Sequence, residues 1–111
     1  MDRKSGSSIS SQQALAVGTN AGVTATIAST GANKRLQCDR IDASGDAAAL
    51  VTIESPASTV LWRKRYAAAF VLSEPFAADQ VVGAVGQALL VKVSASTSNS
   101  EAGIYGSELR G

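Results

Sequence analysis

Apolar and polar residues alternate along much of this chain, which is the pattern of half-buried β-strands. The runs with this alternation cover residues 23–27, 34–41, 50–54, 59–66 and 88–96. In the second run the alternation slips at Arg40 and Ile41, where we expect a bulge or the end of a strand. Residues 12–17 suit either a short helix or a strand. No stretch keeps helical apolar spacing over three turns, so we expect little helix.

Segments rich in Gly, Ser, Asn and Asp separate these runs and predict turns, for example at residues 29–33 and 43–47. We expect Pro56 to close the strand at 50–54, because proline cannot donate to a β-ladder. We also expect Glu74-Pro75 to interrupt the chain after the apolar segment 67–72. In the run from 88 to 96 the alternation predicts that Leu90 and Lys92 face outward, away from the core.

With candidate strands at residues 12–17, 81–82 and 101–109, the five runs make about seven or eight short strands separated by small-residue turns. This pattern predicts an all-β fold, a small antiparallel β-sandwich that is jelly-roll-like. The length of 111 residues suits one domain. We assign residues 12–111 to this β-sandwich domain and residues 1–11 to a flexible N-terminal arm. The arm is polar and Ser-rich, so alone it cannot bury enough apolar area to offset the entropy of ordering.

Residues 59–66 contain the strongest charge cluster of the chain, Arg63-Lys64-Arg65. On an extended strand one side would carry Val60, Trp62, Lys64 and Tyr66, and the other Leu61, Arg63 and Arg65. Neither side is wholly apolar, so we expect this strand to leave the core partway. The basic cluster either contacts an acidic protein surface or phosphates, or it is a solvated strand that discourages edge pairing. Trp62 is either a core plug or an interface anchor.

Composition narrows the chemistry that the chain supports. It has no His, and its single Cys38 can form neither an internal disulfide nor a thiolate zinc site. Because Cys38 alternates in phase with Leu36, we expect it to be a small buried hydrophobe. No P-loop, dinucleotide or serine-hydrolase motif is present. We therefore expect a protein that is not an enzyme and that binds no cofactor and no metal.

Charge and hydropathy indicate the surroundings of the protein. The net charge is +1, which argues against a surface built for nucleic acid. No apolar run approaches 18 residues, and no signal-peptide core follows Arg3 and Lys4. We expect a soluble protein with no membrane partner, made in a reducing cytoplasm.

Four segments of the chain look like the strands of small β-sandwich structural proteins of tailed bacteriophages, such as capsid decoration and cement proteins. The segments are GANKRLQCDRI, AALVTIES, FVLSEPF and GQALLVKVSAS, and the resemblance covers about residues 31–108. In such proteins a basic alternating strand leads into a small-residue turn, and a G-x-A-L strand follows later. The chain differs from them in its Arg63-Lys64-Arg65 cluster and its long polar head.

This resemblance implies a virion structural protein on the capsid surface, synthesised in the cytoplasm of a bacterial host. Its partner would be the major capsid protein, and by analogy it would be a homo-oligomer, with a trimer favoured. The candidate contact residues are Arg3, Lys4, Trp62, Arg63 and Arg65. The alternative is a tail or fibre β-sandwich that binds a receptor or carbohydrate, for which Trp62, Tyr66 and Tyr105 supply the aromatic rings.

Overall fold

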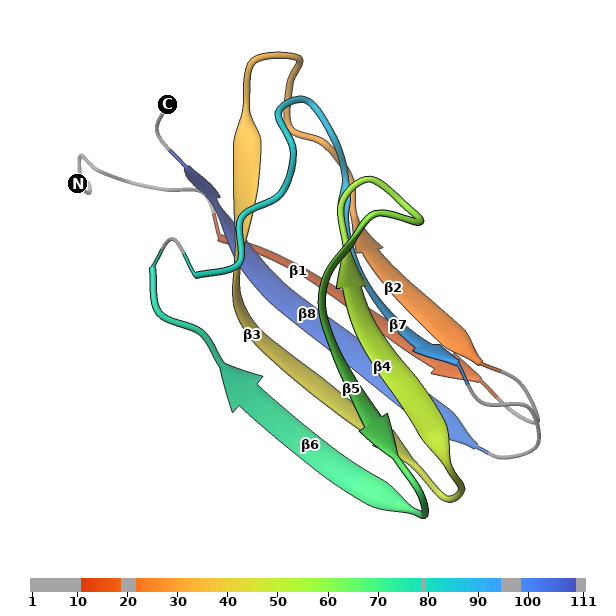
Figure 1. Cartoon of the computed structure of the whole chain (residues 1–111). Helices are drawn as coiled ribbons and strands as arrows, with labels where there is room; N and C mark the ends of the chain where they lie inside the picture. Colours follow the sequence, from red (N-terminus) through yellow and green to blue (C-terminus); the bar gives the residue numbers. More distant parts are fainter. Residues whose placement is uncertain (1–10, 19–21, 79, 95–98, 110–111) are drawn as a thin grey trace.

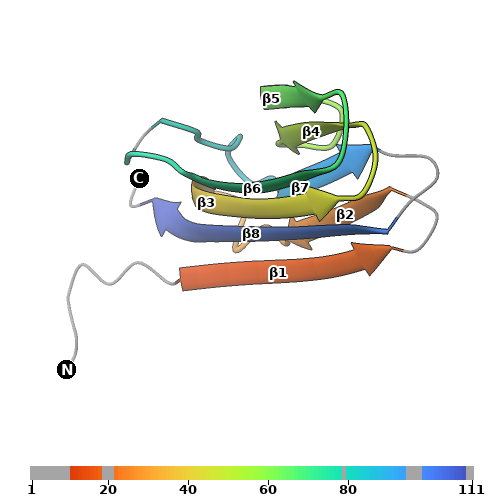
Figure 2. The ribbon, with the colours of Figure 1, turned by 90° about the horizontal axis from the view of Figure 1, so that it is seen from below.

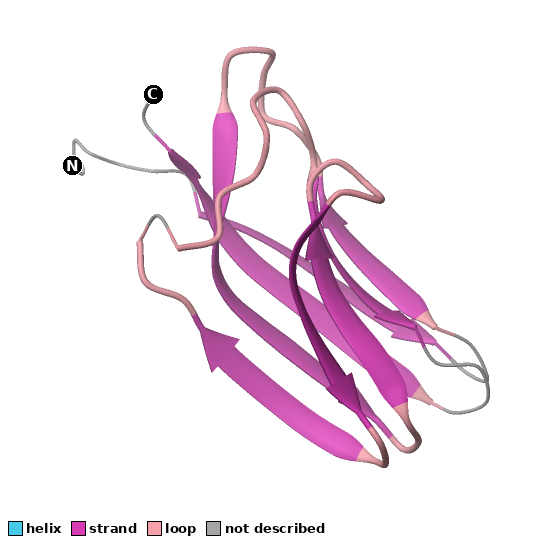
Figure 3. Cartoon of the chain, in the orientation of Figure 1, coloured by secondary structure: helices cyan, strands magenta, loops and turns pink. Residues whose placement is uncertain are grey.

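The computed structural model describes residues 11–18, 22–78, 80–94 and 99–109. In this part the chain forms eight β-strands and no helix (Figure 1, Figure 3). The strands are β1 (Ser11–Gly18), β2 (Val23–Ile27), β3 (Arg35–Gly45), β4 (Ala49–Glu54), β5 (Val60–Tyr66), β6 (Phe70–Pro75), β7 (Leu89–Ser94) and β8 (Ser100–Leu109). The ambiguous run at 12–17 is a strand. The all-β prediction is confirmed.

The strands form two four-stranded antiparallel sheets that pack together. Sheet I has the order β1-β8-β3-β6, and Figure 2 shows these four strands side by side. Sheet II has the order β2-β7-β4-β5. Of the seven connections between the described strands, six cross from one sheet to the other and only β4–β5 stays within a sheet. This interleaved order is that of a jelly roll, so the predicted jelly-roll-like sandwich is confirmed.

The core lies between the sheets and is mainly aliphatic. Strand β2 shows the underlying alternation most simply, because Val23, Ala25 and Ile27 are buried and the two threonines between them are exposed. The largest fully buried side chains are Leu36, Ile41, Ile53, Leu89 and Ile104. Apolar burial of this kind is the main favourable term in folding.

The slip in the alternation of β3 is a β-bulge inside a continuous strand. Cys38 lies opposite Gly106, and Arg40 lies opposite Tyr105, which leaves Asp39 as the extra residue. The extra residue lets both Cys38 and Ile41 face the core. Its carbonyl oxygen accepts a hydrogen bond from the Phe76 backbone N–H at 2.9 Å.

Two predicted strand ends were wrong. Residues 43–45 continue β3 instead of turning, because they pair with β8 on one side and with β6 on the other. Strand β6 also runs through Glu74 to Pro75, where an interruption was expected. Its position explains this, since β6 is an edge strand and an edge tolerates the missing donor of proline.

Leu90 faces outward as predicted, but its side chain is covered. It lies on the outer side of β7, yet only 6% of its surface is exposed. Strand β7 is a central strand, and Leu90 lies directly between Thr26 of β2 and Glu54 of β4. Neighbours on both sides therefore cover it.

Several predictions concern residues that the structure does not describe. Arg3 and Lys4 lie outside the described residues, as does the arm up to residue 10. Strand β1 begins at Ser11, the last residue assigned to the arm. Within the described part of the chain, no helix is long and apolar enough to span a membrane.

Candidate functional site

The basic cluster of the sequence lies on β5, an edge strand of sheet II. Arg63 lies opposite Thr52 of β4, and Arg65 lies opposite Leu50. Val51 and Ile53 of β4 face the core with no exposed surface, so their neighbours Leu50 and Thr52 point outward. Directly opposite residues share a face, which places Arg63 and Arg65 on the outer face of sheet II.

A third cation joins the two arginines on this face. Lys92 of β7 lies opposite Thr52 on one side and Thr24 on the other, so Thr24, Lys92, Thr52 and Arg63 form one row across the sheet. Lys92 and Arg63 are two strands apart, about 9–10 Å by strand spacing. We call Arg63, Arg65 and Lys92, all of them exposed, the basic face.

The charges of the basic face are not neutralised within the described part of the chain. No salt bridge to Arg63, Arg65 or Lys92 occurs there. One cation of sheet I behaves differently. Arg40 pairs with Asp42 at 3.2 Å and lies 4.3 Å above the Tyr105 ring.

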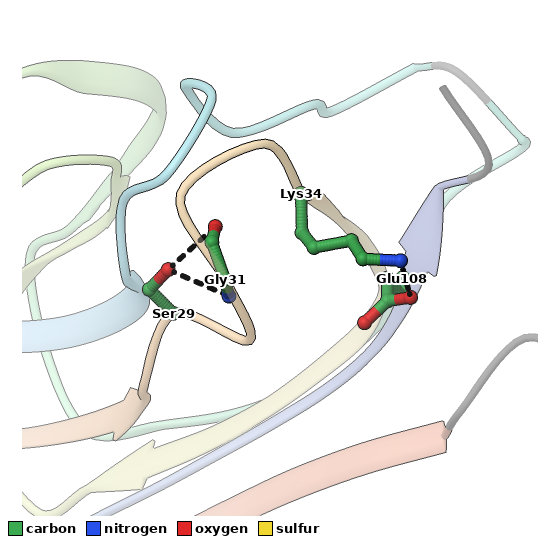
Figure 4. A network of polar contacts seen from close by, with 4 residues as sticks. All are labelled: Ser29, Gly31, Lys34 and Glu108. Carbon is green, nitrogen blue, oxygen red and sulfur yellow. Dashed lines mark hydrogen bonds and ion pairs between the residues drawn. The ribbon is translucent and has the colours of Figure 1, made fainter.

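Lys34 also has an internal partner, at the other end of sheet I. Its Nζ lies 3.4 Å from Oε1 of Glu108 at the end of β8 (Figure 4). In the same loop, the Ser29 hydroxyl donates to the Gly31 carbonyl at 3.2 Å and accepts from the Gly31 N–H at 3.3 Å. These contacts hold the loop before β3, so the charge of Lys34 contributes to the fold.

One carboxylate lies beside the basic face. Glu54 is 5% exposed, and it accepts hydrogen bonds from the Thr52 hydroxyl at 2.8 Å and the Ser58 backbone N–H at 2.7 Å. Burial alone would raise the pKa of Glu54. The bonds from Ser58 and Thr52, together with the nearby charge of Lys92, outweigh burial and hold the pKa below its ordinary value of 4.5. Glu54 thus stays ionised and accepts bonds from the strand and loop around it.

The opposite side of β5 faces the open flank of the sandwich. Trp62 is half-buried and meets the Phe76 ring edge-on at 5.6 Å, and Tyr66 stacks on Phe70 at 4.2 Å. Lys64 lies between them with its Nζ 5.5 Å from the Tyr66 ring centre. The prediction of two mixed sides is confirmed, and Trp62 closes the flank between β5 and the segment after β6.

The expected faces of β5 were wrong at one end. The register with β4 shifts between Ile53 and Glu54, so Trp62 lies opposite Ile53 and Val60 opposite Glu54. Leu61 is the extra residue of this bulge. Val60 consequently leaves the side of Trp62 and lies toward the outer face, 48% exposed.

Sheet II has two hollows at the end where β2 and β4 begin and β5 and β7 end. A hollow of about 560 Å³ is lined by Lys92 and residues of β2, and another of about 440 Å³ is lined by Arg65 and Tyr66. The two share Ala48 and Ser94 as lining residues. Both are open to solvent.

Sequence reasoning found part of this arrangement. It placed Arg63 and Arg65 on one side of a strand with Lys64 on the other, and the structure agrees. It predicted Lys92 to face outward, which is confirmed, but it had no means of placing Lys92 in the same row as Arg63. Cys38 is buried as predicted, and burial with the adjacent Asp39 charge raises the pKa of its thiol to about 12. Within the described residues, no cluster of three or more Cys, Asp or Glu side chains could hold a metal ion.

Comparison of this chain with protein-family models, with curated proteins and with solved structures finds no significant match.

Proposed function

We propose that this protein is a virion structural protein, a capsid cement or decoration protein that holds neighbouring major capsid subunits together. The observation that carries the proposal is the basic face, on which Arg63, Arg65 and Lys92 present three exposed cations without a salt bridge in the described residues. An acidic patch on the capsid surface is the matching partner. Jelly-roll sandwiches also recur in viral capsid domains, which supports the proposal by analogy at the level of the fold.

The contact would act by interface burial and ion pairing, without chemistry. Arg63 and Arg65 are two residues apart on a strand, about 6.5–7 Å, so each reaches a separate carboxylate. An exposed ion pair contributes only about 0–1 kcal/mol. Many copies on one shell add avidity, and several weak pairs then give a stable coat.

The alternative function, a tail or fibre sandwich that binds a receptor or carbohydrate, has less support. A sugar site of that kind needs an exposed aromatic ring. Trp62 contacts Phe76, Tyr66 stacks on Phe70, and Arg40 covers Tyr105. Each of the three candidate rings is thus already engaged within the molecule.

The test is retention of the chain on virus particles purified from the culture that produces it. We expect wild-type protein in the particle fraction, released as salt is raised. The double variant Arg63→Ala/Arg65→Ala should be released at lower salt, because fewer charge pairs remain to resist screening. Circular dichroism of the free variant checks that it is folded.

The control variant Lys34→Ala/Arg35→Ala removes the same charge from the start of β3 and the loop before it. It also breaks the Lys34–Glu108 ion pair, so its folding is checked by circular dichroism as well, and the folded variant should be released over the wild-type salt range. If the double variant of β5 also keeps the wild-type range, Arg63 and Arg65 are solvated bystanders. If wild-type protein never enters the particle fraction, the virion role itself is wrong.

A further inference from the structure

We infer that β1 is a self-pairing edge: two copies of this chain join β1 to β1, antiparallel about a two-fold axis, into one eight-stranded sheet. Sheet I ends at β1, which pairs with β8 alone among the described strands. An unpaired edge presents backbone donors and acceptors that can bind another strand. The inference concerns the free protein and does not depend on capsid binding.

The other three edges carry features that oppose pairing. Strand β5 has three consecutive cations and a bulge, so two copies of β5 would repel each other. Strand β6 ends in Glu74-Pro75, and β2 is only five residues long. Charge, proline and short length are the usual protections of a sheet edge.

Strand β1 lacks all of these protections. Its sequence SQQALAVG contains no charge and no proline, and all eight residues pair with β8 in unbroken register. Of the four sheet edges, β1 is the best suited to pair with a second copy of itself, because it is long and carries no charge. Two such strands bring no like charges together.

The outer side of β1 is also apolar and uncovered. Leu15 is 64% exposed and Val17 is 74% exposed. Leu15 leans over β8, where a Cβ added to Gly103 would lie 2.7 Å from the Leu15 Cδ2. A groove of about 400 Å³ runs from this ridge across the face to Val71 of β6. Pairing at the edge would bring the two ridges together and shield them from water.

The faces of β1 restrict the register. Gln13, Leu15 and Val17 are exposed, whereas Ala14 and Ala16 pack against the core. Opposite residues share a face, so exposed positions must oppose exposed positions. Centring the pair on Leu15 aligns residues 12–18 of both copies, with Leu15 opposite Leu15. Centring the pair on Ala14 would place the apolar Leu15 opposite the polar Gln13. Centring it on Ala16 would align only residues 14–18 of the two copies.

The experiment measures the mass of the full chain in solution by light scattering over a concentration series. We expect wild-type protein at twice the 11.2 kDa of the single chain. Leu15→Lys places two like charges at the two-fold axis and should reduce the mass to one chain. Val71→Lys is the matched control, since it adds the same charge at a position 89% exposed on the far edge of the same face, and it should stay a dimer.

Leu15→Cys provides a second measurement, a disulfide crosslink between two copies, which tests the contact without weakening it. Mild oxidation should link two copies through this residue, while Val71→Cys should remain uncrosslinked. The native Cys38 is buried and gives no background. A monomeric or trimeric wild-type protein, a folded Leu15→Lys variant that stays dimeric, or absence of the Leu15→Cys crosslink would each overturn the inference.

Discussion

Single residues in this sandwich owe their properties to where the sheets place them. Cys38 has 1% of its surface exposed, and with a pKa raised to about 12 its thiol stays protonated at neutral pH. Since the thiolate is the reactive form, this cysteine behaves as a small apolar core residue. Glu54 is the opposite case, because hydrogen bonds keep its carboxylate charged in a buried position.

Replacing Glu54 with Gln should change how stability depends on pH. The folded-state pKa of Glu54 lies below 4.5, so its contribution is complete above that pH and is lost as pH falls through the folded-state value. We expect Glu54→Gln to lose about 1–2 kcal/mol at neutral pH, because charge-assisted bonds are among the stronger ones. Its melting temperature should then fall less than that of wild type on acidification.

Thermal melts from neutral pH to below 4.5 measure this difference. The pKa of Glu108 is also lowered, by a hydrogen bond from Thr30 and then by the bond and charge of Lys34. Glu108 is present in both proteins, so its contribution cancels and the comparison isolates Glu54. Glu101→Gln removes an exposed carboxylate and should follow the wild-type profile. Parallel profiles for Glu54→Gln and wild type would contradict the prediction.

At the scale of elements, the β4–β5 hairpin holds β5, which carries Arg63 and Arg65, in place. Its loop closes with hydrogen bonds from the Ser55 N–H to the Thr59 carbonyl and from the Thr59 N–H to the Pro56 carbonyl, both 3.0 Å. Ser55 is buried, and its hydroxyl donates to the Ala88 carbonyl at 2.6 Å. The loop is thereby fastened to the segment before β7, and β5 is held where Arg63 and Arg65 face outward.

Ser58 in this loop has a φ of 78°, a left-handed conformation that costs a residue with a Cβ about 1–2 kcal/mol. Ser58→Gly should remove that cost and keep the N–H that donates to Glu54. Because Gly loses more chain entropy on folding, we expect a net gain of up to about 1 kcal/mol. Chemical denaturation measures it. Ser58→Ala should show no gain, and a Gly variant less stable than wild type would contradict the argument.

At the scale of the whole molecule, the jelly-roll order binds the two sheets into one unit. Six of the seven connections between described strands cross between sheets, so neither sheet is a continuous stretch of sequence. Both sheets also share one core. We therefore expect the domain to unfold as a single cooperative unit.

Truncation of the core in either sheet should test this cooperativity. Ile53 of sheet II and Ile104 of sheet I are both fully buried, and Ile→Ala at such sites costs about 2–5 kcal/mol. Each variant should lower the midpoint of the whole transition, with Trp62 fluorescence and far-ultraviolet circular dichroism still coincident. Val71→Ala, at an exposed site, should change stability by less than about 0.5 kcal/mol. Separate transitions by the two probes would show that the sheets unfold independently.

The sequence by itself determined where several of the strands lie and which of their residues share a side. Alternation with period two follows from backbone geometry within a strand, so it located β2 without error and β4, β5 and β7 to within about one or two residues at each end. It also marked the slip in β3 that proved to be a bulge at Asp39. The side of Arg63 and Arg65 follows from the same local rule.

Only the tertiary structure decided which strands are neighbours. Pairing joins residues far apart in sequence, so a local pattern could not predict that Lys92 lies beside Thr52 or that Leu90 has neighbours on both sides. It also could not predict that β3 stays extended through Gly45. The shift opposite Glu54 and the low pKa of that residue likewise depend on contacts with β5 and the loop before it. Sheet order determines which side chains share a face, and sheet order is set by the packing of the whole chain around one core.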